Sequence, residues 1–129
     1  MRISSAIVIG IIGVGLLTGC GSTDSSSEYC AAAAELGKIS IRAGTTTTDM
    51  VSKSRNVAAV APADIKADWE IYAKAQERLA AAGKTPTDLS DPTKALDSLD
   101  TRARETEEAA AALSAATPKI TTHLEQNCK

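Results

Sequence analysis

Large apolar side chains are scarce in this chain, and their scarcity limits the folds that it can adopt. Between residues 28 and 129 there are seven Leu, five Ile, three Val and no Phe, or 15 of 102 residues. A well-formed hydrophobic core usually requires more than about 20% of these residues. Alanine, the best helix former, takes many of the remaining positions, and the net charge of −2 is too small to favour disorder. We therefore expect thin helices that pack closely through small side chains.

Prolines divide the chain into helical segments. The sequence predicts five helices, over about 27–43, 49–61, 62–83, 92–116 and 118–128. Proline suits the first position of a helix and disrupts its interior, so Pro62, Pro92 and Pro118 are each expected to begin a helix. Asp91 and Thr117 are the expected N-caps of the last two helices. The predicted fold class is all-α, a small bundle of four to five short helices in one domain.

Apolar residues recur at helical spacing and predict the buried face of each helix. The clearest stripe is Ile65, Trp69, Tyr72, Gln76 and Leu79. The stripe expected to be buried on 92–116 is Leu96, Leu99, Ala103, Thr106, Ala110 and Leu113. The other expected stripes are Tyr29, Ala33, Leu36 and Ser40; Met50, Ser54, Val57 and Val60; and Ile120, Leu124 and Cys128. The charged residues of the fourth helix are expected to face solvent: Arg102, Arg104, Glu105, Glu107 and Glu108.

The N-terminal segment has the parts of a bacterial export signal. A positive start at Met1 and Arg2 precedes an apolar run over residues 6–17, and small residues follow it. The run is too short and too interrupted by glycine to form a membrane-spanning helix. We therefore expect the chain to be exported.

Leu17-Thr18-Gly19-Cys20, at the end of the apolar run, resembles the lipobox of bacterial lipoproteins. The resemblance implies cleavage between Gly19 and Cys20 and attachment of a diacylglyceryl group to the Cys20 sulfur. It also implies that the protein lies on the extracytoplasmic face of the cell membrane, held there by lipid. The alternative is an ordinary secretory signal that is cut nearby, which would leave a mature chain without an anchor.

The signal predicts a simple domain organisation. Residues 1–19 are expected to be removed, 20–27 to form the lipidated cysteine and a flexible polar tether, and 28–129 to form the helical domain. In composition and layout the chain resembles small Ala- and Thr-rich exported lipoproteins of high-GC Gram-positive bacteria. That resemblance contains no functional motif.

Two further cysteines stand near the ends of the helical domain. Exported proteins enter an oxidising compartment, so Cys30 and Cys128 are expected to form one disulfide between the first and last helices. Closing so long a loop stabilises a fold by about 4.7 kcal/mol in the chain-entropy picture. The alternative is two free thiols.

Residues suited to catalysis or metal binding are few. The single histidine, His123, has no second histidine or free cysteine with which to form a zinc site, and we expect it at a surface or helix end. Asp97 with Asp100, and Glu105 with Glu108, are spaced three residues apart, which is typical of a solvated helix face. The sequence therefore predicts no catalytic residue, no metal site and no cofactor.

Trp69 and Tyr72 lie one turn apart and, with Tyr29, are the only aromatic residues. They are expected to fill the core, and the alternative is that Trp69 and Tyr72 line a groove for an apolar ligand. The acidic balance excludes a nucleic-acid partner. The leading hypothesis is a non-enzymatic envelope lipoprotein that acts by protein–protein interaction. The alternative is an extracytoplasmic carrier or sensor of a small apolar ligand held between helices.

Overall fold

The computed structural model describes residues 22–40, 46–84 and 87–129, with the side chains of 22–25 and 40 left out. These residues form four α-helices and no strand: α1 (Ser22–Ser40), α2 (Thr47–Val60), α3 (Ala63–Lys84) and α4 (Pro92–Asn127). A disulfide joins Cys30 to Cys128, with the two Cα atoms 5.4 Å apart. The predicted all-α bundle and its disulfide are both confirmed. None of the four helices is long and apolar enough to cross a bilayer.

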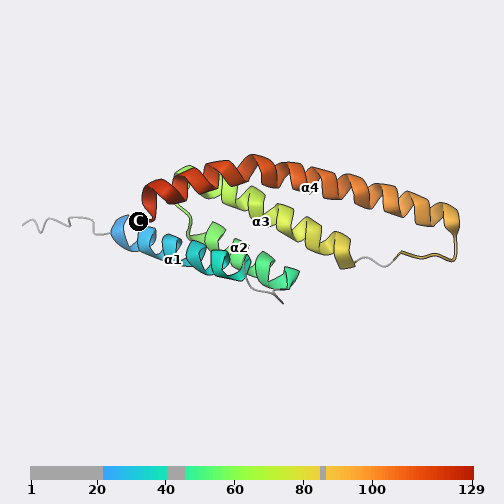
Figure 1. The fold of residues 1–129 in the computed structure, drawn as a ribbon, viewed down its shortest axis with the longest axis horizontal. Coiled ribbons are helices and arrows are strands. Elements are labelled where there is room, and N and C mark those ends of the chain that lie inside the picture. The colour runs from blue at the N-terminus through green and yellow to red at the C-terminus, as the bar shows by residue number, and fades with distance from the viewer. Residues whose placement is uncertain (1–21, 41–45, 85–86) are drawn as a thin grey trace, which may run out of the picture.

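The helices pack in the order in which they follow one another. α1 packs against α2, α2 against α3, and α3 against α4 (Figure 1). The beginning of α1 lies beside the C-terminus, where the disulfide closes the chain, and the beginning of α4 lies at the opposite end. Because α4 is much longer than α3, its first turns extend past the end of α3 (Figure 1). One end of the molecule is therefore covalently closed, and the other carries a projecting helix.

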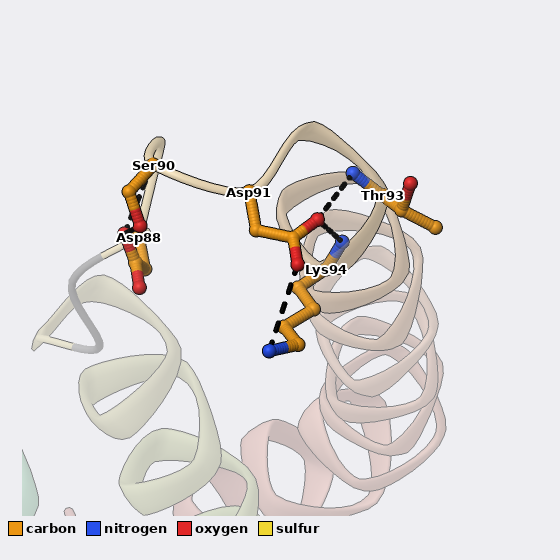
Figure 2. A network of polar contacts seen from close by, with 5 residues as sticks. All are labelled: Asp88, Ser90, Asp91, Thr93 and Lys94. Atoms are coloured by element: carbon orange, nitrogen blue, oxygen red, sulfur yellow. Dashed lines mark hydrogen bonds and ion pairs between the residues drawn. The ribbon is translucent and has the colours of Figure 1, made fainter.

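Polar side chains fix the starts of two helices. The Thr46 hydroxyl accepts from the Asp49 amide at 3.2 Å, and the Asp49 carboxylate accepts from the Thr46 amide, so a capping box begins α2. Figure 2 shows the start of α4, where the Asp91 carboxylate accepts from the amides of Thr93 and Lys94. Asp91 is thus the N-cap that the sequence predicts, while α2 begins slightly earlier than predicted.

The predicted helix break at Thr117 and Pro118 is wrong, because α4 runs through both residues (Figure 1). Pro118 has no N–H to donate to the carbonyl four residues earlier. The carbonyl that loses this donor is that of Ser114, and one residue earlier the Thr117 hydroxyl donates to the Leu113 carbonyl at 2.7 Å. Ala116 and Ile120, on either side of the proline, are both buried in the core. Burial of one continuous face therefore outweighs the loss of a backbone hydrogen bond.

α1 also differs from its predicted extent, because it begins at Ser22. The segment 22–27, expected to be a flexible tether, forms the first turns of this helix. Serine and threonine are tolerated in a helix that continues into a run of alanine, as this one does after Cys30.

Alanine supplies much of the core. Among the described residues, eight of the 14 buried hydrophobic residues are alanines. The larger buried side chains come from all four helices: Tyr29, Leu36, Val57, Ile65, Trp69 and Ile120. The expectation of thin helices packed through small side chains is confirmed.

The buried face of α4 is not the predicted stripe. Ala95, Ala109, Ala116 and Ile120 are buried, whereas Leu96 is 67% exposed and Leu99 is 47% exposed. Ala103, Thr106 and Ala110 are exposed as well, and Leu113 is half-buried. α3 presents buried alanines of its own, and small residues of α4 allow the two helices to approach closely. The leucines consequently point away from the core.

Candidate functional site

A chain of hydrogen bonds joins three helices beside the disulfide. The indole N–H of Trp69 donates to the Tyr29 hydroxyl at 3.0 Å. The Tyr29 oxygen lies 3.2 Å from Nδ1 of His123, and Nε2 of His123 lies 3.3 Å from an oxygen of Asp64. Residues from α1, α3 and α4 therefore form one group, which we call the Tyr29 network: Tyr29, Asp64, Trp69 and His123.

The donor and acceptor roles in the Tyr29 network are mutually consistent. The indole N–H can only donate, so the Tyr29 oxygen accepts from it. The tyrosine hydrogen then points to Nδ1 of His123, which accepts when the histidine is neutral with its hydrogen on Nε2. On the other side of the ring, Nε2 lies 3.3 Å from the Asp64 carboxylate. The polar atoms of Trp69, Tyr29 and His123 are thus all matched within the network.

Tyr29 is a structural residue. It is fully buried, and burial is the main reason that the pKa of its hydroxyl lies above the ordinary value of 10.0. The hydrogen bond from Trp69 lowers that pKa, and the negative charge of Asp64 raises it. Edge-on contacts between the rings of Tyr29, Trp69 and His123 fill the space around it. A hydroxyl enclosed in this way cannot reach a substrate, so the network holds helices together.

His123 lies near the end of α4, as expected, but the alternative that it lies at the surface is wrong. Only 12% of its side chain is exposed, since one ring edge faces Tyr29 and the other meets Asp64. In sequence, His123 follows Ile120 by three residues and so shares its buried face. That spacing, together with the two buried aromatic residues, is the signal that would have placed it.

Two of the four exposed large apolar side chains of the described residues lie on one side of α4, in a row that we call the α4 stripe: Leu96, Leu99, Ala103, Thr106 and Ala110. All five residues are exposed. Leu89, in the connection before α4, is also 78% exposed. Exposed large apolar residues that recur along one helix are typical of interaction surfaces, whereas single ones are ordinary. The α4 stripe is therefore the candidate functional site.

An open groove of about 640 Å³ continues the α4 stripe toward α3. Its lining residues come from both helices: Leu79, Ala82, Gly83, Leu99, Arg102, Ala103 and Thr106. Arg102, expected to face solvent, is half-buried because its guanidinium donates to the Ala82 carbonyl at 2.9 Å and the Thr87 hydroxyl at 2.7 Å. Arg102 thus holds the end of α3 against α4.

Acidic residues border the other side of the α4 stripe. Asp100 and Glu107 are exposed and follow Leu99 and Thr106 directly in sequence. Asp100 is paired with Arg104 of the same helix at 2.8 Å. The other predicted surface carboxylates, Asp97, Glu105 and Glu108, are exposed as expected.

The remaining predicted site residues are placed as follows. Gly19 and Cys20 lie outside the described residues. Trp69 is 3% exposed and belongs to the core, and Tyr72 is half-buried with its ring edge-on to Trp69. Within residues 22–40, 46–84 and 87–129, no three His, Cys, Asp or Glu side chains are grouped closely enough to hold a metal ion.

Comparison with known proteins gives no relative. No family model, no curated protein and no solved structure matches this chain significantly.

Proposed function

We propose that the chain is a lipid-anchored lipoprotein of the cell envelope, which acts by protein–protein contact and catalyses no reaction. The observation that carries the proposal is the α4 stripe, where Leu96 and Leu99 are left exposed although large apolar residues are scarce in the chain. Exposing two of the seven leucines of residues 28–129 costs a small core some of its stabilisation, so an exposed stripe is best explained by a partner.

The geometry of the bundle supports an anchor at one end and a contact at the other. α1 begins at Ser22, two residues after the proposed lipid at Cys20, and its beginning lies beside the disulfide (Figure 1). The 36 residues of α4 span about 54 Å along their axis. The first turns of α4 are therefore presented well away from the anchored end, toward a partner in the same envelope.

The anchor is tested by replacing Cys20. Wild-type protein is expected in the membrane fraction and labelled by a radioactive or clickable fatty acid, whereas Cys20→Ser is expected to lose both properties. Each buried methylene contributes about 0.8 kcal/mol, so loss of two acyl chains abolishes stable membrane binding. Membrane retention and acyl labelling of Cys20→Ser would refute the lipoprotein assignment.

The contact is tested by photo-cross-linking in intact cells. A photoreactive amino acid at Leu96 is expected to yield a cross-linked protein species, and the same probe at Thr101, also exposed but on the opposite side of α4, is expected to yield none. An absence of any species specific to position 96 would contradict a role in protein–protein contact, whatever the outcome for the anchor.

A further inference from the structure

We propose that the partner of the α4 stripe is a second copy of this chain, bound in parallel through a short α4–α4 coiled coil. This inference rests on the proposed function, because it names the partner of the same surface. The two helices would meet along the stripe, with their starts at the same end. The spacing of the stripe, the charges beside it and the common anchor support this arrangement.

The spacing is that of a coiled-coil seam. Leu96, Leu99, Ala103, Thr106, Ala110 and Leu113 are separated by three, four, three, four and three residues. This alternation is the heptad pattern of two helices that wind around each other, with Leu96 at an a position and Leu99 at a d position. Residues of the core-facing side of α4, such as Ala95 and Ala109, occupy other heptad positions. The seam leaves these buried alanines outside it, while Leu99, Ala103 and Thr106 also border the groove toward α3.

The charges beside the seam favour a parallel pair. Asp100 and Glu107 occupy the e positions, and Arg102 occupies a g position. In an antiparallel pair e positions face e positions, which would bring acidic Asp100 close to Glu107 of the partner subunit. In a parallel pair e faces g, and Glu107 then lies on the side of Arg102 of the partner subunit, whose guanidinium is also held by Ala82 and Thr87 of its own chain. The parallel arrangement therefore avoids the repulsion between like charges.

The proposed anchor favours the same arrangement. Two copies held by Cys20 in one membrane present their α4 helices in the same direction. The seam covers fewer than three heptads and has alanine or threonine at its centre, so its intrinsic affinity is low. Confinement to a membrane supplies the high effective concentration that such a weak seam needs. We therefore infer a dimer that forms at the membrane.

Disulfide trapping in native membranes tests the inference with the full-length chain. Leu96→Cys places a thiol in the seam, where a parallel in-register pair brings it next to its own copy. Thr101→Cys, at an exposed f position on the far side of α4, is the matched control. Copper-phenanthroline oxidation followed by non-reducing electrophoresis is expected to give a reducible dimer of Leu96→Cys and only background for Thr101→Cys.

Orientation is tested by mixing two tagged copies. A parallel pair traps Leu96→Cys with itself, whereas an antiparallel pair traps Leu96→Cys with Leu113→Cys. A dimer of Leu96→Cys no stronger than that of Thr101→Cys, a dimer found only in the mixed pair, or a cross-link from position 96 to a different protein would each overturn the inference. A cross-link to a different protein would leave the proposed function standing.

A second pair of variants separates the seam from the anchor. In an Ala103→Cys chain, Leu99→Asp is expected to abolish trapping because it places charge in the seam, while Thr101→Asp leaves trapping intact. Equal trapping in both would refute the α4 seam. Cys20→Ser is expected to lower the trapped fraction by about tenfold or more, through loss of confinement. Undiminished trapping of Cys20→Ser, with the protein still in the membrane fraction, would refute the lipid anchor while the dimer stands.

Discussion

The hydroxyl of Tyr29 lies 3.2 Å from Nδ1 of His123, a residue 94 positions further along the chain. Together with the Cys30–Cys128 disulfide, one residue away from Tyr29, this contact fixes the first helix to the end of the last. α1 otherwise packs chiefly on α2. The position of α1 over the core therefore depends on a small group of residues at one end of the bundle.

Tyr29→Phe is expected to lower the free energy of unfolding by about 1–3 kcal/mol, because the indole N–H of Trp69 and Nδ1 of His123 lose their buried partner. Chemical denaturation measured by Trp69 fluorescence gives this value. Tyr72→Phe, at a half-buried position, is the matched control and is expected to change stability less. Equal effects of the two variants would show that the hydroxyl of Tyr29 contributes nothing specific.

The raised pKa of Tyr29 predicts a sensitivity to alkali. In the folded chain its hydroxyl titrates above the value of 10.0 that it has when unfolded, chiefly because of burial. The contribution of the neutral hydroxyl is fully present below pH 10 and is lost as the pH rises through the higher folded pKa. Tyrosinate absorbance should show one late-titrating tyrosine that is absent in Tyr29→Phe. A Tyr29 hydroxyl that titrates at or below pH 10 in the folded protein would contradict this.

Replacing both Cys30 and Cys128 by alanine is expected to destabilise the bundle by about 4–5 kcal/mol, since the disulfide closes a loop across a separation of 98 residues. Denaturation of the double variant beside the oxidised wild type measures the difference. Reduced wild type should match the double variant. A change in the free energy of unfolding well below 1 kcal/mol would mean that the disulfide does not restrict the unfolded chain.

Pro118→Ala is expected to stabilise the protein by about 1–3 kcal/mol, because it restores an N–H inside a continuous helix at an exposed position. Pro92→Ala is the matched control, and little change is expected because Pro92 occupies the first position of α4. Thermal or chemical unfolding followed by circular dichroism compares the two. Destabilisation by Pro118→Ala would indicate that the chain needs a proline-induced break there.

Asp91→Ala is expected to cost about 1 kcal/mol of stability, since it removes the cap that accepts from the amides of Thr93 and Lys94 (Figure 2). Asp97→Ala, at an exposed position within α4, is the control. Hydrogen exchange at the first turn of α4 should become faster only in Asp91→Ala. Similar exchange rates in both variants would show that the Asp91 cap does not stabilise the first turn of α4.

Local sequence signals predicted much of the fold. Asp91 and Pro92 defined the start of α4, and Ala61 before Pro62 defined the end of α2. Trp69 and Ile65 were predicted to be buried, and they are. Cys30 and Cys128 were predicted to meet, and they do. These signals are caps, prolines and the spacing of large apolar residues. Each is a property of a short segment, so it can be recognised before any tertiary contact is known.

The face of α4 could not be predicted in the same way. Its leucines and its buried alanines both recur at helical spacing, and hydropathy favours burial of the leucines. The choice is made by the packing of α4 against α3, where small residues of α4 are buried. Continuity of α4 through Pro118 likewise depends on burial of Ala116 and Ile120 by other helices. Both the buried face of α4 and its continuity depend on packing between helices, which cannot be predicted from the sequence of one helix alone.

The link between Cys30 and Cys128 also determines how the domain would respond to pulling. A force applied at the start of the chain reaches Cys30 and is transmitted through the disulfide to Cys128, at the end of α4. The polypeptide between them is a covalent ring, and tension entering at Cys30 and leaving at Cys128 bypasses it. Force applied between the two ends of the chain would thus leave the helices within the ring folded for as long as the disulfide stays oxidised, whereas force applied at the exposed leucines of α4 acts inside the ring.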